Sequence, residues 1–249
     1  MSVKLKLISI VLLYFGLNNF LYAENVHVAV ASNFSTTMKL LKISFEGITG
    51  HRVTISSAST GKLFAQIVHG APYDLFFSAD SARADLLVKK GLADKSSVYA
   101  QGQLMYVAKD IEQKKCRASL RNKPTGRLAM ANPKTAPYGF AAREVLINLG
   151  RWDALRQNIV MGENILQTFQ FISTGSAAAG FLAQSIVINS GELGGYCQWR
   201  VPDNLYQPIK QKMTLLNRSD NNIAVQAFFR YMNSKIANKI IKESGYIVN

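Results

Sequence analysis

The four residues STGK at 59–62 stand where a strand-like run, 51–58, gives way to an apolar helix-like run, 61–70. A hydroxyl-rich turn before a helix suits anion binding, because the first N–H groups of a helix lack partners and its dipole end is positive. A nucleotide-binding P-loop also needs a glycine five residues before the Gly-Lys pair and a Ser or Thr after the lysine. Ser56 and Leu63 occupy those positions. The stretch therefore predicts a cradle for some other oxyanion.

Three further junctions between strand-like and helix-like runs carry polar donors. Ser32 and Asn33 follow HVAVAS, Pro137-Tyr138-Gly139 follows GRLAMAN, and Glu163-Asn164-Ile165 precedes a helix. In α/β units the carboxyl end of a strand and the amino end of a helix lie at the same edge, where ligands bind. Taken singly, each junction reads as an ordinary helix N-cap worth about 1 kcal/mol. All four can supply N–H groups, hydroxyls or amides to an anion.

The sequence shows no competing catalytic constellation. Its three histidines are His27, His51 and His69, and none has a Cys or carboxylate at nucleophile or metal spacing. The Gly-x-Ser-x-Gly motif is also absent. Asp74 and Asp80 flank a strand and are interpreted as cap and turn residues. Lys62, on the first turn of a helix, is expected to point to solvent.

Strand-like and helix-like runs alternate along the chain, which predicts an α/β fold. The expected strands span 27–32, 51–58, 73–79, 104–109, 126–132, 180–185 and 212–217. The expected helices span 35–50, 61–70, 82–91, 140–150, 165–175, 225–234 and 236–245. No Pro/Gly/Ser-rich linker interrupts the chain, so two domains, if present, would be joined by strands. That arrangement implies a hinge with a cleft.

The first 23 residues, MSVKLKLISIVLLYFGLNNFLYA, carry two lysines, an apolar run and a small residue before Glu24. This pattern is typical of a cleaved secretory signal peptide, with an uncleaved anchor as the alternative. The remaining 226 of the 249 residues contain no apolar run of about 20 residues that could span a bilayer. No cysteine lies near the cleavage site, which argues against a lipid anchor. The sequence thus predicts an exported soluble protein.

The net charge of +14 falls to +12 without Lys4 and Lys6. Such a charge can mark a nucleic-acid partner, but the basic residues are spread among apolar helix positions, as on solvated faces. No nucleic-acid partner is therefore expected. Cys116 and Cys197 in an oxidising compartment predict one disulfide, and their spacing fits no metal site.

At these junctions the sequence resembles the periplasmic molybdate-binding proteins of ABC uptake systems. The resemblance rests on four blocks: VAVASNFSTTM (28–38), SASTGKLFAQIVHGAPYDLFFSAD (57–80), RLAMANPKTAPYGFAAREVL (127–146) and GENILQTFQFISTGSAAAGFLAQS (162–185). It implies a type II periplasmic binding protein, an α/β fold with a ligand cleft between two lobes. The expected lobes are 24–104 plus 210–249, and 105–209, after a signal peptide at 1–23.

The resemblance also implies the ligand contacts. These are Ser32 with Asn33, Ser59 or Thr60, and the backbone N–H groups of Tyr138 and Ile165. The metal of the oxyanion would be held only through its oxygens, with no cofactor. Some members place a tyrosine hydroxyl where this chain has Ala183. Members with the Ala-Pro-Tyr-Gly form use the Asn and Tyr equivalents, so Asn33 and Tyr138 are expected to replace it.

The function implied is capture of molybdate, and of tungstate, in the periplasm by a monomer that delivers it to an ABC permease in the inner membrane. The protein is not expected to be an enzyme. A binding protein for sulfate or another tetrahedral oxyanion is the nearest alternative. An exported serine hydrolase would need a histidine beside Ser32 or Ser59, and a purely structural or adhesive protein would show no stabilisation by anions.

Overall fold

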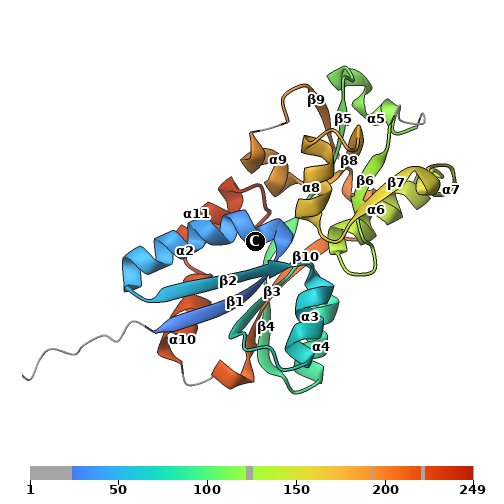
Figure 1. Cartoon of the computed structure of the whole chain (residues 1–249). Coiled ribbons are helices and arrows are strands. Elements are labelled where there is room, and N and C mark those ends of the chain that lie inside the picture. The colour runs from blue at the N-terminus through green and yellow to red at the C-terminus, as the bar shows by residue number, and fades with distance from the viewer. Residues whose placement is uncertain (1–23, 122–125, 192, 220–221, 249) are drawn as a thin grey trace, which may run out of the picture.

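The chain folds into two lobes, each built on a five-stranded mixed sheet (Figure 1). The computed structural model describes residues 24–121, 126–191, 193–219 and 222–248. The predicted signal peptide, 1–23, lies outside these residues. No helix in the described ranges is both long and apolar enough to cross a membrane.

The first lobe holds the sheet ordered β2-β1-β3-β10-β4. Its strands are β1 (Asn25–Ala31), β2 (Arg52–Ala58), β3 (Leu75–Ser78), β4 (Ala93–Gly102) and β10 (Ile209–Leu216). Its helices are α2 (Ser35–Thr49), α3 (Thr60–Val68), α4 (Ser81–Lys89), α10 (Ile223–Tyr231) and α11 (Lys235–Glu243), with short 3-10 helices η1 (Ser32–Phe34) and η5 (Asn217–Ser219). The apolar side chains of α2, α10 and α11 cover one face of the sheet and those of α3 and α4 the other.

The second lobe holds the sheet ordered β7-β6-β8-β5-β9. Its strands are β5 (Leu104–Lys109), β6 (Leu128–Ala131), β7 (Ile159–Gly162), β8 (Ala179–Ala183) and β9 (Tyr196–Arg200). Its helices are α5 (Cys116–Ser119), α6 (Pro137–Asn148), α7 (Trp152–Leu155), α8 (Ile165–Ser173) and α9 (Gln184–Ser190), with 3-10 helices η2 (Gln113–Lys115), η3 (Arg156–Asn158) and η4 (Asp203–Leu205). A disulfide joins Cys116 to Cys197 within this lobe, with their Cα atoms 5.5 Å apart.

Local sequence explains where the helices begin and end. Helix α2 buries Met38, Leu41 and Phe45, which recur at helical spacing, and it stops at Gly50, whose φ of 74° is a left-handed conformation that glycine adopts readily. Helix α6 begins with Pro137, whose missing N–H is no loss on a first turn. These starts and stops set the edges at which the polar junctions lie.

Parallel strand pairing brings the junctions together within each lobe. In the first lobe Ala31 at the end of β1 pairs with Ala58 at the end of β2, so η1 and α3 start side by side. In the second lobe Ala131 at the end of β6 pairs with Gly162 at the end of β7, so α6 and α8 also start at one edge. Figure 1 shows the two lobes meeting at these edges.

The chain passes between the lobes twice. It leaves the first sheet after Gly102 and enters the second at Leu104, then returns between Arg200 and Ile209. Strand β10 then lies antiparallel between β3 and β4, inside the first sheet. The division into lobes of 24–104 plus 210–249 and of 105–209 stays a proposal. We refer to these two crossings as the hinge region.

Candidate functional site

A small cavity lies between the lobes and is lined by all six residues that the sequence predicts as ligand contacts. Its walls are Ala31, Ser32, Asn33, Ser59 and Thr60 from the first lobe and Ala136, Pro137, Tyr138 and Ile165 from the second. The volume of this cavity is only about 10 Å³. That is room for about one water molecule, so the walls must move apart slightly to admit a tetrahedral oxyanion.

Helix N-termini surround this cavity. Helix α3 begins after Ser59, α6 after Ala136, and α8 after Asn164, while η1 begins at Ser32 and runs on into α2. The first N–H groups of each helix have no acceptor inside the helix, and the helix dipole makes this end positive. The Asn164 side chain accepts from the N–H groups of Leu166 and Gln167, both at 3.0 Å, and so caps α8 without using Ile165. The cavity thus gathers donors for an anion.

Among the predicted contacts, Ser59 has the clearest structural evidence for a role in ligand binding. The residue is only 2% exposed, and its Oγ has no hydrogen-bond partner in the part of the chain that the structure describes. Although Ser59 is the N-cap of α3, its hydroxyl makes no capping bond. A buried hydroxyl without a partner costs about 1–3 kcal/mol. The arrangement is therefore consistent with a hydroxyl whose partner is a ligand.

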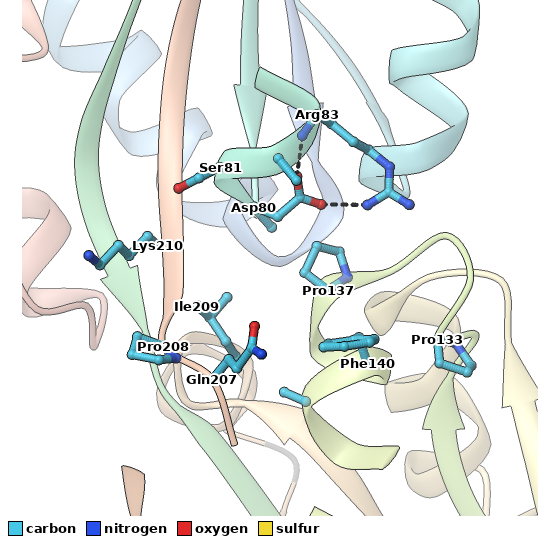
Figure 2. A pocket seen from close by; sticks show the side chains of 13 residues that line it. Asp80, Ser81, Arg83, Pro133, Pro137, Phe140, Gln207, Pro208, Ile209 and Lys210 are labelled. Atoms are coloured by element: carbon cyan, nitrogen blue, oxygen red, sulfur yellow. Dashed lines mark hydrogen bonds and ion pairs between the residues drawn. The ribbon is translucent and has the colours of Figure 1, made fainter. Parts of the chain in front are cut away.

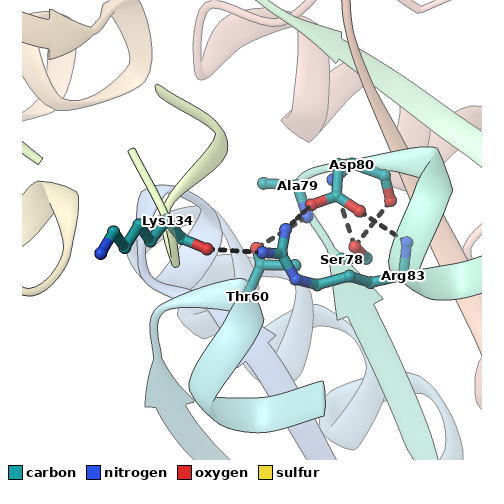
Figure 3. Close-up of polar contacts among 6 residues, drawn as sticks. All are labelled: Thr60, Ser78, Ala79, Asp80, Arg83 and Lys134. Atoms are coloured by element: carbon teal, nitrogen blue, oxygen red, sulfur yellow. Dashed lines mark hydrogen bonds and ion pairs between the residues drawn. The ribbon is translucent and has the colours of Figure 1, made fainter. Parts of the chain in front are cut away.

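The neighbouring Thr60 hydroxyl is already engaged. Its Oγ1 accepts from the backbone N–H of Ala79 at 3.2 Å, as Figure 3 shows, so only its own proton is left to donate. The sequence left open whether Ser59 or Thr60 contacts the ligand. The free Oγ favours Ser59 as the stronger candidate, with Thr60 beside it.

The Asn33 side chain is turned away from the role expected of it. Its Nδ2 donates to Gln211 Oε1 at 2.9 Å and to Tyr246 Oη at 3.1 Å, which uses both of its N–H groups. We expected this amide to help replace the tyrosine hydroxyl that is missing at Ala183. Ala183 is fully buried at the end of β8, immediately before α9. In this structure Asn33 could offer an anion only its backbone N–H.

The Tyr138 hydroxyl points to the hinge region. Its Oη accepts from Gln211 Nε2 at 3.3 Å, and a Cβ added to Gly102 would lie 2.0 Å from it. Burial raises the pKa of Tyr138 well above its usual value, so the hydroxyl keeps its proton. Sequence reasoning missed Gln211, although a glutamine on the buried face of β10, in line with Ile209 and Met213, was a usable signal.

The cavity offers donors but no ionised side chain. Among the described residues that line it, Tyr138 alone can ionise, and no Asp, Glu, Lys, Arg or His takes part. Burying a charge demands many hydrogen bonds, and charge-assisted ones are the strongest. The site could therefore hold an anion by hydroxyl and N–H groups.

The histidines lie elsewhere, as do the metal-ligating residue types. His27 Nε2 is 3.0 Å from Ser56 Oγ, His51 Nδ1 accepts from the N–H of Glu24 at 3.4 Å, and His69 ends α3. None of the three lines the cavity, so a hydrolase with Ser32 or Ser59 as nucleophile lacks its base. Across the described ranges no group of three or more His, Cys, Asp or Glu residues could hold a metal ion.

Contacts between the lobes flank the cavity and hold it closed. The N–H of Gly61 donates to Thr135 O at 2.9 Å, and Arg83 Nη2 donates to Lys134 O at 2.8 Å (Figure 3). Lys62 was expected to point to solvent, and its side chain is half exposed, but its Nζ also pairs with Glu163 across the lobes. Both side chains of that pair are more than half exposed, so its contribution is small, about 0–1 kcal/mol.

A larger cavity between the lobes is a weaker candidate. Its volume is about 440 Å³, and Asp80, Arg83, Phe140 and Lys210 are among its lining residues (Figure 2). The Asp80 carboxylate caps α4 by accepting from the Arg83 N–H at 2.8 Å and also pairs with the Arg83 guanidinium. None of the six predicted contacts lines it. A space of this size would leave a small oxyanion largely hydrated.

The chain matches known proteins over most of its length. Residues 26–247 match the family model described as bacterial extracellular solute-binding protein. The chain is 40% identical over 227 residues to the molybdate-binding protein ModA of Azotobacter vinelandii, covering 90% of each, and 37% identical over 227 residues to that of Rhodobacter capsulatus, covering 90% of this chain and 89% of the relative.

A solved structure shares the whole fold. The periplasmic molybdate-binding protein of Azotobacter vinelandii matches with a TM-score of 0.84 at 33% identity, over 90% of this chain and 99% of the other. The sulfate-binding protein SubI of Mycobacterium tuberculosis matches with a TM-score of 0.73 at 14% identity, over 90% and 87%, a likeness of fold alone. The chain therefore belongs to the bacterial extracellular solute-binding proteins, a family of binding proteins rather than enzymes.

Proposed function

We propose that this protein captures molybdate, and also tungstate, in the periplasm and delivers it as a monomer to an ABC permease in the inner membrane. The observation that carries the proposal is the donor-lined cavity between the lobes, with its buried and unpartnered Ser59 hydroxyl. The identity of 40% and 37% to two proteins named as molybdate-binding supports the choice of anion.

A tetrahedral dianion suits the donors around the cavity. The groups that would hold its oxygens are the hydroxyls of Ser32, Ser59 and Thr60 and the backbone N–H groups of Asn33, Tyr138 and Ile165. Helix N-termini add favourable dipole ends. A protonated phosphate would need an acceptor for its proton, and the described lining residues bring no carboxylate or imidazole. The arrangement favours fully deprotonated oxyanions.

Closure would couple binding to delivery. Ser32 and Ser59 belong to the first lobe and Tyr138 and Ile165 to the second, so an anion can touch all four only when the lobes are closed. A ligand shifts a two-state equilibrium by its difference in affinity for the two states. A permease that distinguishes the closed shape could then recognise the loaded protein.

Thermal unfolding with added anions tests the proposal. In protein dialysed free of anions, molybdate or tungstate at 100 times its dissociation constant should stabilise the fold by about 2.7 kcal/mol. For a chain of this size that is a rise of roughly 5–10 °C in the unfolding midpoint. Sulfate and phosphate at equal concentration are the comparison. A shift with sulfate alone would favour the sulfate alternative, and no shift with any anion would reject an oxyanion function.

Replacing Gly61 by alanine should weaken molybdate binding about fivefold, because closure is then obstructed. An added Cβ would lie 3.1 Å from the Cα and O of Thr135 in the opposite lobe, so the lobes must shift by a few tenths of an ångström. Such overpacking costs about 1 kcal/mol or more. The ligand-free protein should be as stable as before, since alanine suits a first helical turn better than glycine. Calorimetric titration measures the change, and unaltered affinity would contradict this closure geometry.

A further inference from the structure

A buried group of six polar residues joins the lobes behind the cavity, and we refer to it as the junction cluster. Its members are Asn33, Tyr99, Tyr138, Ser185, Gln211 and Tyr246. All six are at most 5% exposed. They come from five separate elements and from the chain near its end, so only the folded and closed protein brings them together.

Gln211 is the centre of one half of the junction cluster. Its Oε1 accepts from Asn33 Nδ2 and from Tyr99 Oη, both at 2.9 Å, while its Nε2 donates to Tyr138 Oη at 3.3 Å. Gln211 lies on β10 where the chain re-enters the first lobe, and Tyr138 lies on the first turn of α6 in the second. This half ties one wall of the cavity to the hinge region.

Ser185 is the centre of the other half. Its Oγ donates to the backbone carbonyl of Asn33 at 3.1 Å and lies 2.9 Å from Tyr246 Oη, which also donates to that carbonyl at 2.7 Å. Ser185 belongs to α9 in the second lobe, whereas Asn33 lies in η1 of the first lobe and Tyr246 packs in the core of that lobe. The bond from Ser185 to Asn33 therefore joins the two lobes.

Asn33 is consequently held by its side chain and its backbone at once. Its amide is fixed by Gln211 and Tyr246, and its carbonyl by Ser185 and Tyr246. Burial raises the pKa values of Tyr99, Tyr138 and Tyr246, so their hydroxyls keep their protons and remain donors. Asn33 also lines the cavity, so its backbone orientation decides where its N–H lies.

We infer that Ser185 is a positioning residue of the oxyanion site, which fixes the Asn33 backbone as the lobes close and holds the closed state without touching the anion. The inference rests on the proposed function for its ligand. The Ser185 bond is made in the closed state and broken on opening, so it slows escape of the anion more than it affects entry. Loss of one such hydrogen bond corresponds to a fall in affinity of roughly 3- to 10-fold.

The test compares Ser185→Ala with Ser119→Ala, measured by calorimetric and stopped-flow titration with molybdate. Ser119 is a matched control: its Oγ also donates to a backbone carbonyl, that of Cys116 at 2.7 Å, and lies 3.2 Å from a tyrosine hydroxyl, that of Tyr106. All those partners lie within the second lobe. Ser185→Ala should bind 3- to 10-fold more weakly, mainly through faster dissociation, while Ser119→Ala should bind as the unaltered protein does.

A second variant separates positioning from general damage. Tyr246→Phe removes the hydroxyl that bridges Asn33 and Ser185, so its effect on affinity and that of Ser185→Ala should combine to less than their sum. Full additivity, an unchanged affinity in Ser185→Ala, or an equal loss in Ser119→Ala would overturn the inference.

Failure of the proposed function would be recognised separately. If the unaltered protein binds no molybdate, small-angle X-ray scattering of the ligand-free proteins still decides the role of Ser185. Because its bond belongs to the closed state, the unaltered protein should have a smaller radius of gyration than Ser185→Ala. Equal radii in that case would overturn the inference.

Discussion

Replacing Ser59 by alanine is expected to weaken molybdate binding by about 10- to 100-fold and to leave the ligand-free protein equally or more stable. A hydrogen bond to a charged group contributes about 1.5–3 kcal/mol, which gives the loss in affinity. The Ser59 Oγ has no partner in the described chain, so removing it breaks no internal bond and relieves a buried polar group. The two effects thus have opposite signs, which a merely structural serine would not show.

Ser97→Ala is the matched control for this variant. The Oγ of Ser97 is also buried and without a partner in the described residues, but it lies on β4 and does not line the cavity. Its replacement should leave molybdate affinity unchanged. Calorimetric titration gives the affinities, and urea unfolding of anion-free protein gives the stabilities. Unaltered affinity in Ser59→Ala would remove Ser59 from the site and leave Thr60 as the hydroxyl donor.

Replacing Gly139 by alanine is expected to lower the free energy of unfolding by about 3 kcal/mol and to abolish most molybdate binding. An added Cβ would lie 2.1 Å from the carbonyl oxygen of Ala131 and 2.6 Å from its carbon, both backbone atoms of β6. Such a contact cannot be relieved by a side-chain rotation, and overpacking costs about 1–3 kcal/mol or more. Helix α6 would have to move away from the sheet, and the N–H of Tyr138 would move with it.

Gly47→Ala is the control, and its effect on the free energy of unfolding is expected to have the opposite sign. Gly47 also lies within a helix, α2, but in the described chain no atom outside its own helical backbone lies within 4 Å of the position of its Cβ. Alanine should therefore stabilise this helix by about 0.5–1 kcal/mol, because it restricts the unfolded chain and favours helix. Urea unfolding of the two variants measures both changes. A stable Gly139→Ala protein with normal binding would show that α6 can separate from β6 at little cost.

Much of the α/β fold could be predicted because its buried strands and capped helices are determined by residues that are close together in the sequence. The expected strand at 104–109 coincides with β5, and the expected helix at 35–50 differs from α2 only at its last residue. Both have apolar spacing that fits one element type. Where the pattern is local and unmixed, the prediction is accurate.

Strands β4, β7 and β9 were not predicted, because they depend on pairing with distant strands rather than on a local sequence pattern. Strand β4, ADKSSVYAQG, carries polar residues without alternation and pairs with β10 through two register irregularities. The expected strand at 180–185 was also too long, since β8 ends at Ala183 and Gln184 begins α9. Tertiary pairing overrides propensity at such edges. That error placed Ser185 in a strand rather than at the start of a helix.

The site, like the fold, was predicted only in part. Its donors lie at ends of parallel strands, a rule that sequence spacing can use, and the structure brings all six predicted contacts to one cavity. The junction cluster could not be foreseen, because Asn33 and Gln211 are 178 residues apart and Asn33 and Tyr246 are 213 apart. No local pattern states that the Asn33 amide turns away from the cavity.

The place of β10 has a consequence for the order in which the chain can fold. The first lobe needs Ile209–Leu216 between β3 and β4, so its sheet stays divided until nearly the whole chain has been synthesised. The second sheet is drawn from one continuous stretch, from Leu104 to Arg200, and can assemble earlier. Domains of a chain generally fold as units with the amino-terminal one first. Here the order of folding is reversed, because the lobe that is synthesised first needs a strand from near the end of the chain and is therefore completed last.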